Sequence, residues 1–271
     1  MRRVSIIMGI YNCAATLSEA LDSILAQSFS DWELILCDDC STDSSLEIAQ
    51  SYKKKFPQKI MVIRNAKNSK LAYTLNHCLR YATGEYIARM DGDDISLPQR
   101  LQKQVDFLDA NPDYAVVSTA MIVFDEKGNK AVRRKIECPD KYSLAANPCF
   151  DHATIMMRKT AFEKLGGYIV SRRTERGQDY DLWFRFFATG YKGYNMQEPL
   201  YKVRENTSTF SRRTLTSRLY IALTMLIGYR LLRYPLKYYV YILKQIVAGL
   251  TPVSVLKFYR KHQDKKSLCV D

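Results

Sequence analysis

Short hydrophobic runs alternate with amphipathic segments over the first 95 residues of the chain. The run Val4–Met8 is apolar and rich in β-branched residues, which is typical of a strand buried on both faces. In the segment 14–27, apolar side chains recur every three or four residues, which predicts a helix with one buried face. The strands are predicted at 4–8, 32–37, 59–64 and 86–90, and the helices at 14–27, from a Ser41 or Thr42 cap to about 55, and at 70–82.

This alternation, with its short connections, predicts an α/β fold with a mostly parallel sheet flanked by helices. In such sheets, ligands bind outside the carboxyl ends of the strands. Polar clusters follow three of the predicted strands: Gly9–Asn12 after the first, Asp38 and Asp39 after the second, and Asp91–Asp94 after the fourth. The topology therefore predicts that the three clusters meet at a single site.

Three carboxylates, those of Asp91, Asp93 and Asp94, stand at the end of the fourth strand. Carboxylates this close repel one another and disfavour their own ionised forms, so a chain keeps such a cluster where a cation offsets the repulsion. Aspartates two positions apart suit Mn²⁺ or Mg²⁺, which take oxygen ligands and leave positions open for phosphate. A polar turn is the alternative interpretation, because a D-x-D pattern is common by itself.

The second half of the chain is less regular. A helix begins near Gln178 and carries Asp179 and Asp181 in its first turn, where acids complement the helix dipole. His152 is as consistent with a structural role as with a functional one. The pattern further predicts a helix at 98–108, strands at 114–118, 121–125 and 155–157, an irregular segment at 126–150, and a flexible, charged stretch at 171–177 that could act as a lid.

Basic residues are concentrated at the end of the chain. Of the net charge of +13, residues 201–271 carry +11, from fourteen Lys and Arg against three acids, which leaves +2 for the first 200 residues. Helices are predicted at 219–232, 236–250 and 253–262, with Arg230, Arg233, Lys237 and Lys244 on one face.

A basic, aromatic helical tail without an apolar run of about 20 residues favours a helix lying in a membrane interface. A helical cap packed on the main domain is the alternative. Nucleic acid is not expected as a partner, because the tail is too apolar and matches no nucleic-acid-binding module.

The seven cysteines are odd in number and scattered, and the N-terminus lacks the apolar stretch of a secretory signal. We therefore expect a cytoplasmic protein with free thiols, peripheral on the inner face of the cell membrane.

Five segments, taken in order, resemble family 2 glycosyltransferases. They are VSIIMGIYN (4–12), SILAQS (23–28), WELILCDDCSTD (32–43), GEYIARMDGDD (84–94) and GQDYDLW (177–183). The resemblance implies a Rossmann-like GT-A fold over residues 1–210, with a nucleotide-sugar-binding half at 1–95 and an acceptor-binding half at 96–210. The C-terminal helical, basic tail would then occupy 211–271.

The resemblance also implies an inverting transfer from a nucleotide-diphosphate sugar, with a UDP-sugar expected. The loop Ile10, Tyr11 and Asn12 is expected to hold the base and ribose together with Asp38 and Asp39. A helix-capping turn is the alternative role for these two acids.

The acidic cluster would serve the diphosphate. Asp91 is expected to reach ribose and phosphate, directly or through the metal, and Asp93 to be the principal ligand of Mn²⁺ or Mg²⁺. A divalent ion stabilises the negative charge that develops on the leaving diphosphate. Asp94 is expected either to support this site from behind or to cap the next helix.

The family places its catalytic base in a Glu-Asp pair, which corresponds here to Gln178 and Asp179. Asp179 is assigned as the general base that removes the acceptor hydroxyl proton, with Asp181 as second candidate. Gln178 departs from the pattern, since an amide can bind the acceptor but cannot act as a base. Arg204 stands where relatives often carry a histidine; it cannot ligate metal, but it can neutralise the diphosphate directly.

We therefore predict an inverting, metal-dependent glycosyltransferase that acts on a glycan or lipid-linked acceptor at the membrane. A non-catalytic glycan- or lipid-binding relative is the first alternative, which the departures at Gln178 and Arg204 permit. A sugar-phosphate nucleotidyltransferase is the second, but it would need a Gly-rich, basic loop, which Gly9–Asn12 does not provide.

Overall fold

The strands and helices predicted for the first 95 residues all form in the computed structural model, which describes residues 2–205 and 215–250, with only the backbone of 248–250. The four strands pair in parallel in the order β3-β2-β1-β4, as the alternation predicted. The elements are β1 (Val4–Ile10), α1 (Ala14–Leu25), β2 (Trp32–Asp38), α2 (Ser45–Lys55), β3 (Ile60–Arg64), α3 (Lys70–Leu79) and β4 (Tyr86–Asp91).

The second half extends this sheet with strands of both directions. β8 and β7 run antiparallel to their neighbours, while β9 is parallel to β6, so the nine-stranded sheet is mixed. The elements are β5 (Ile95–Ser96), α4 (Arg100–Ala110), β6 (Tyr114–Asp125), β7 (Gly128–Arg133), β8 (Met156–Arg158), α5 (Lys159–Leu165), α6 (Gln178–Ala188) and β9 (Lys192–Arg204), with short 3₁₀ turns η1 (His152–Thr154) and η2 (Arg172–Thr174).

Several boundaries predicted for this half are wrong. β6 is one strand rather than two, because Ser118 and Thr119, which interrupt its apolar pattern, are buried with hydrogen-bond partners and the ladder continues through them. Part of the segment predicted as irregular forms β7, and α4 begins at Arg100 rather than at Pro98. The charged stretch expected to be a flexible lid contains η2, whose Thr174 is fully buried.

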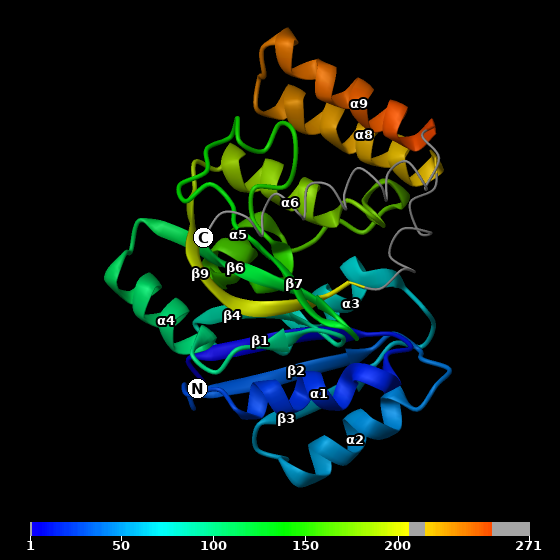
Figure 1. Cartoon of the computed structure of the whole chain (residues 1–271), viewed down its shortest axis with the longest axis vertical. Coiled ribbons are helices and arrows are strands. Elements are labelled where there is room, and N and C mark those ends of the chain that lie inside the picture. Colours follow the sequence, from blue (N-terminus) through cyan, green and yellow to red (C-terminus); the bar gives the residue numbers. More distant parts are fainter. Residues whose placement is uncertain (1, 206–214, 251–271) are drawn as a thin grey trace.

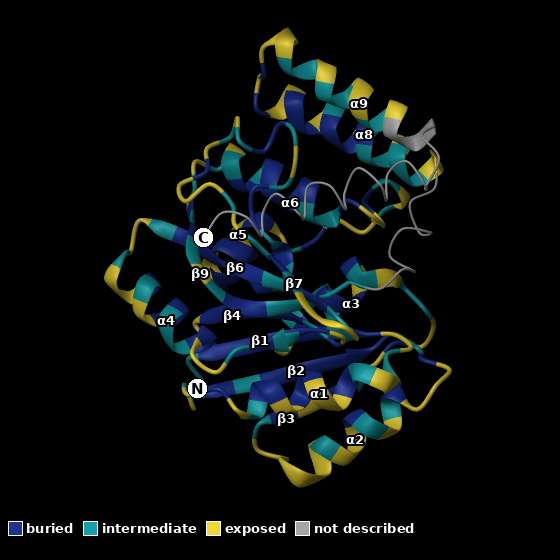
Figure 2. Ribbon diagram, in the orientation of Figure 1, coloured by how far each residue is buried: buried dark blue, intermediate teal, exposed yellow. Residues whose placement is uncertain are grey.

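Hydrophobic side chains pack on both faces of the sheet. The central strands are accordingly coloured mostly as buried in Figure 2. Successive residues of a strand point to opposite faces. Ile6 and Met8 of β1 therefore join the cluster under α1, α2 and α4, whereas Ile7 joins the cluster under α3, α5 and α6. This double cover explains why the parallel strands read as continuous apolar runs in the sequence.

A helical pair stands at one end of the molecule, with α8 (Leu215–Leu231) against α6 and α9 (Val240–Leu250) beyond it; the short turn η3 (Leu236–Tyr239) precedes α9 (Figure 1). The Tyr229 side chain of α8 is fully buried and packs edge-on against the Phe184 ring, with 5.9 Å between centroids. One side of the described tail thus packs on the domain, and the expected contact with a membrane stays a prediction.

The helix predicted at 253–262 and the boundary predicted at 210 fall outside the described residues. Within the part that is described, no helix is both long and apolar enough to cross a bilayer.

Candidate active site

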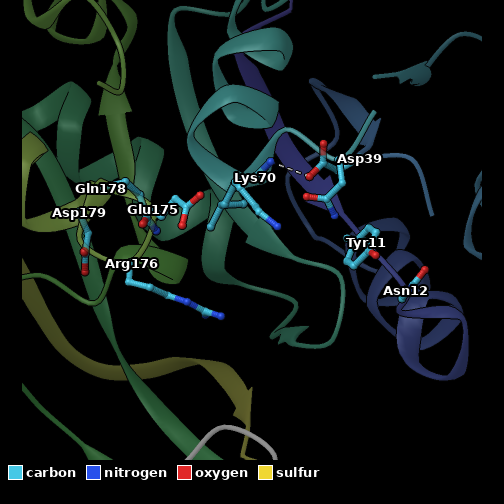
Figure 3. A pocket seen from close by; sticks show the side chains of 10 residues that line it. Tyr11, Asn12, Asp39, Lys70, Glu175, Arg176, Gln178 and Asp179 are labelled. Carbon is cyan, nitrogen blue, oxygen red and sulfur yellow. Dashed lines mark hydrogen bonds between the residues drawn. The ribbon is translucent and has the colours of Figure 1, made fainter. Parts of the chain in front are cut away.

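A cavity of about 700 Å³ opens at the carboxyl ends of the parallel strands, between the two halves of the chain (Figure 3). Residues from the first half line one side and residues around the start of α6 line the other, with the Arg176 side chain extending between them. The lining residues are Tyr11, Asn12, Asp39, Asn68, Lys70, Leu71, Glu175, Arg176, Gln178 and Asp179.

The loop after β1 presents Tyr11 and Asn12 to this cavity. Asn12 has a positive φ of 49° and is fixed by the next loop, since its Oδ1 accepts from the Thr42 N–H at 2.8 Å and its own N–H donates to Ser41 Oγ at 3.1 Å. The side chain of Ile10 is instead buried in the core under α1, so only its backbone can take part in the predicted base-binding loop.

The two acids after β2 have different surroundings. Asp38 is fully buried; it accepts from the Ser41 N–H and forms an ion pair with Arg64 at 3.2 Å, so it holds the turn and does not line the cavity. Asp39 does line the cavity, although it is only 4% exposed. Asp38 therefore holds a turn, but this turn does not cap α2. That helix begins at Ser45 with Ser44 as its N-cap residue, not with the predicted Ser41 or Thr42.

Asp39 fixes the start of α3. It accepts from Asn65 Nδ2 at 2.8 Å, from the Ser69 N–H at 2.7 Å and from the Lys70 N–H at 2.9 Å. Lys70 has a positive φ of 69°, which is uncommon for a residue with a side chain, and these hydrogen bonds hold it there. The result is a lysine placed at the wall of the cavity.

Asp91, Asp93 and Asp94 form a carboxylate cluster in which one oxygen of each lies within 4.8 Å of the others. The cluster does not line the cavity itself but adjoins the loop after β1. A Cβ at Gly92 would lie 3.0 Å from both Cys13 Sγ and Ile10 Cγ2, so glycine lets the turn approach that loop.

Hydrogen bonds from two arginines hold two of the three carboxylates of this cluster in place. Arg89 Nη2 donates to Asp91 Oδ1 at 2.5 Å, and the Arg204 N–H donates to Asp94 Oδ1 at 2.8 Å. Burial and the neighbouring charges of Asp91 and Asp93 raise the pKa of Asp94 well above its ordinary value. Asp94 is therefore tied to β9 and does not cap α4, whose first turn has no side-chain cap.

The Arg204 guanidinium is occupied by protein groups. Its Nε donates to the Asp93 carbonyl at 3.0 Å, its Nη2 pairs with Glu19 of α1, and its plane lies 4.5 Å from the Phe124 ring centroid. In this arrangement Arg204 holds the acidic turn in place, which differs from the predicted direct contact with diphosphate.

The two aspartates in the first turn of α6 have different surroundings. Asp181 is 6% exposed and forms ion pairs with Arg173 at 2.7 Å and Arg185 at 2.8 Å, which occupy both of its oxygens. Asp179 lines the cavity instead. Burial raises the pKa of Asp179, while backbone N–H groups and the charges of Arg89 and Lys135 oppose that rise.

Gln178 also lines the cavity, and its Oε1 is buried without a hydrogen-bond partner among the described residues.

His152 is buried; its Nε2 lies 2.9 Å from Tyr168 Oη, and burial together with the charge of Arg89 lowers its pKa well below the ordinary value. A neutral, structural histidine fits these surroundings.

The sequence interpretation missed Asn68, Lys70, Glu175 and Arg176 as cavity residues. A signal existed for the first two, because the segment after β3 must reach the same sheet edge as those after β1, β2 and β4. Glu175 and Arg176 belong to the charged stretch 171–177 that was suggested as a lid, but no signal assigned either of them to the site. They follow a 3₁₀ turn whose placement depends on α8.

Comparison with known proteins agrees with this arrangement. The family described as Glycosyl transferase family 2 matches residues 5–173. A relative from Bacillus subtilis (strain 168), named "Putative glycosyltransferase EpsE", is 49% identical over 259 residues, which cover 96% of this chain and 93% of the relative. Amylovoran biosynthesis glycosyltransferase AmsE of Erwinia amylovora is 30% identical over 215 residues, covering 77% of this chain and 79% of the relative.

Two solved structures share the fold at low sequence identity. S. aureus TarS 1-349 in complex with UDP has a TM-score of 0.63 at 19% identity, covering 92% of this chain and 70% of TarS. Mannosyltransferase PcManGT from Pyrobaculum calidifontis, in complex with GDP-Man and Mn²⁺, has a TM-score of 0.62 at 18% identity, covering 97% of this chain and 80% of that one. At these identities the likeness establishes the fold alone.

Proposed function

The chain belongs to glycosyltransferase family 2 and is a glycosyltransferase with the predicted GT-A fold, and from this premise we propose its reaction. It transfers a sugar from a nucleotide-diphosphate donor, with UDP as the nucleotide, to a glycan or lipid-linked acceptor in a single inverting displacement. The observation that supports this proposal is the shared cavity. Tyr11, Asn12 and Asp39, three of the residues expected to bind the nucleotide, line one wall, and Asp179 lines the other.

On the donor side, Tyr11, Asn12 and Asp39 are the residues proposed to receive the base and ribose. Tyr11 is 48% exposed, so its ring is free to stack on a nucleobase. Lys70 and Arg176 bring two positive charges to the same cavity and suit a diphosphate. Structures of TarS with UDP and of PcManGT with GDP-Man support a nucleotide-sugar donor for this fold.

The carboxylate cluster fits a divalent metal ion. Its three oxygens lie close enough for one ion. The pKa of Asp94 is raised by burial and, to a smaller extent, by the charges of Asp91 and Asp93, which a cation at the cluster would offset. We propose that Asp93 and Asp91 hold Mn²⁺ or Mg²⁺, with Asp94 held behind them. A bound ion would act as a Lewis acid on the diphosphate oxygens.

On the acceptor side, Asp179 is proposed as the general base. In the transfer, the acceptor oxygen forms a bond to the sugar C1, the bond from C1 to the phosphate oxygen breaks, and Asp179 takes the hydroxyl proton. The diphosphate leaves with the electron pair on the opposite face, which inverts the anomeric configuration. Gln178 Oε1, buried and without a partner among the described residues, is positioned to accept from an acceptor hydroxyl.

We also propose a role in polysaccharide synthesis at the cytoplasmic membrane face. The relative AmsE is named for amylovoran biosynthesis, and the excess of basic residues in this chain lies in its tail. A lipid-linked acceptor would make attachment to the membrane useful.

Calorimetric titration with UDP, GDP and dTDP, each with Mn²⁺ and with EDTA, tests the donor site. We expect UDP to bind in Mn²⁺, to lose most of its affinity in EDTA, and to show the same loss in Asp93→Ala with Mn²⁺ present. Equal binding of UDP in Mn²⁺ and EDTA would contradict the metal site. Release of pyrophosphate from a nucleoside triphosphate would instead indicate a nucleotidyltransferase.

A further inference from the structure

An unusual number of exposed aliphatic side chains lies on the helical pair at the end of the molecule. Among the described residues, eighteen large hydrophobic side chains are exposed, and nine of them belong to α8, η3 and α9. On α8 they recur every fourth residue and are 41–49% exposed; on η3 and α9 they are 48–84% exposed. They are Leu215, Leu219, Leu223, Ile227 and Leu231, followed by Leu236, Val240, Leu243 and Val247.

The opposite side of α8 is committed to the domain. Met225 and Tyr229 are fully buried, and Tyr229 Oη donates to the Ala145 carbonyl at 2.6 Å. Thr224 Oγ1 donates to the Arg173 carbonyl at 3.2 Å, which ties α8 to η2. The helix is therefore apolar on both sides, and the domain covers only one of them.

A helix that is apolar all round is normally buried all round. Figure 2 shows exposed residues along both helices, on the part of the molecule farthest from β3 and α2. The outward side of α8 and α9 thus has the composition of a covered surface, although no described segment covers it.

The charges beside these aliphatic residues point to one kind of partner. Residues 215–250 contain five basic residues and no acid. Arg230, Arg233, Lys237 and Lys244 are exposed. Arg218 instead donates to Gln245 Oε1 at 2.6 Å and links the two helices. Apolar side chains edged by cations, without acids, complement an anionic lipid surface, in which the aliphatic groups enter the acyl boundary and the cations meet the headgroups.

We propose that the outward faces of α8 and α9 form a docking surface for an anionic phospholipid bilayer. The nine aliphatic side chains named above contact lipid, and the exposed arginines and lysines contact headgroups. This inference deepens the proposed function, because it names the surface through which the enzyme would meet a membrane that carries its acceptor. Tyr229 and Tyr234 of this aromatic tail are buried against the domain, so they do not belong to the docking surface.

Vesicle co-sedimentation of the full chain tests the surface. We expect binding to phosphatidylcholine vesicles that contain phosphatidylglycerol, weak binding to phosphatidylcholine alone, and loss of binding as salt rises. Leu223→Ser/Ile227→Ser should weaken binding at least about tenfold, because each inserted aliphatic side chain contributes on the order of 1 kcal/mol or more. Arg230→Glu/Lys237→Glu should weaken it by about as much, since a cation at an anionic surface contributes about 1 kcal/mol.

Matched controls exist elsewhere on the chain. Met61→Ser/Ile136→Ser removes two exposed aliphatic side chains outside the helical pair, and Lys53→Glu/Lys54→Glu reverses two exposed charges on α2. Both controls should bind vesicles like the wild type, and all variants should keep its melting temperature. Equal losses in the controls, or wild-type binding by the aliphatic variants, would overturn the proposal.

A second copy of the chain is the competing occupant. Sedimentation velocity that showed a dimer, dissociated by Leu223→Ser/Ile227→Ser, together with no vesicle binding by the wild type, would assign the surface to self-association and overturn the lipid proposal. UDP binding measured on the same proteins separates the lipid proposal from the proposed function. A wild-type protein that binds vesicles but does not bind UDP would count against the proposed function alone.

Discussion

Individual side chains acquire their roles here from local surroundings more than from residue type. Asp179 and Asp181 lie two positions apart in the first turn of one helix, yet two arginines hold Asp181, while Asp179 faces the cavity. Removing one partner of a buried ion pair leaves an uncompensated charge, which usually destabilises the fold. The two aspartates should therefore differ in what their replacement damages.

We expect Asp179→Asn to lower kcat by about 10²–10⁴-fold, the usual contribution of a general base, with UDP binding and melting temperature nearly unchanged. Asp181→Asn should instead lower the melting temperature, because Arg173 and Arg185 would lose their charged partner. Steady-state kinetics, calorimetry with UDP and thermal unfolding on both proteins check this. Full turnover by Asp179→Asn would remove it as the base.

Arg89 is the buried cation that links the two sides of the site. It donates to Asp91, is itself 5% exposed, and its charge favours the ionised form of Asp179. Lys135 acts on Asp179 in the same direction. Burial raises the pKa values of Tyr168, Tyr180 and Cys149, and the charge of Asp179 adds to the rise. A base must be ionised, so activity should fall as pH drops through the raised pKa of Asp179.

Arg89→Met should move the acid limb of the kcat profile to higher pH, because the ionised base loses a favourable charge. It should also raise the donor KM, since Asp91 loses its anchor. Arg89→Lys should return the acid limb of the kcat profile nearly to its wild-type pH, but should restore the donor KM less fully. The reason is that lysine keeps the positive charge but not the guanidinium geometry.

The control for this measurement is Arg158→Met. That arginine is partly buried and donates to the carbonyls of Tyr114 and Leu108. Its replacement therefore removes a partly buried arginine and its hydrogen bonds, as Arg89→Met does, but leaves the residues of the site unchanged. An acid limb that stays in place in Arg89→Met would show that the charge of Arg89 does not act on the base.

Contacts between elements fix the position of α6, which carries the proposed base. α6 carries Asp179 at its start and packs under α8 through Phe184, at a point where α8 has glycine. A Cβ at Gly228 would lie 2.2 Å from Phe184 Cγ, which is far inside van der Waals contact. The close approach of these two helices therefore depends on the absence of a side chain.

Gly228→Val should destabilise the protein by about 1–3 kcal/mol, the usual cost of overpacking, and should lower kcat by displacing α6. Thermal unfolding and turnover measure both effects. Thr216→Val, an exposed substitution on the same helix, is the matched control and should change neither. A melting temperature unchanged by Gly228→Val would mean that α8 and α6 separate without cost.

In the molecule as a whole, the fold separates the three proposed tasks in space. The parallel half presents its loops at one sheet edge, the segment at the start of α6 lines the other side of the cavity, and the α8–α9 pair stands beyond α6 (Figure 1). The charge follows this division, with the first 200 residues near neutral and the tail strongly basic. A donor site, an acceptor wall and a membrane-facing end can thus coexist in 271 residues. The division into domains at 1–210 and 211–271 stays a prediction.

The sequence by itself determined the parallel half of the sheet and the edge at which its polar loops gather. Local apolar patterns suffice there, because strands buried on both faces and one-sided helices have distinct periods, and the crossover rules leave little choice of topology. The position of the Asp91–Asp94 cluster beside the loop after β1 followed from the same reasoning. In the structure, a Cβ at Gly92 would touch Ile10 and Cys13 on either side of that loop, although the cluster does not line the cavity.

The family resemblance ranked Asp179 before Asp181, but only the tertiary structure shows which member of each pair faces the cavity. Asp39 and Asp179 line it, whereas Asp38 pairs with Arg64 of β3, and Asp181 pairs with Arg173 of η2 and Arg185 one turn later. The same holds for α8, which has apolar residues on two opposite sides; only the packing of Tyr229 on Phe184 shows which side is inward. Such choices depend on contacts between segments far apart in the chain, and no local pattern encodes them.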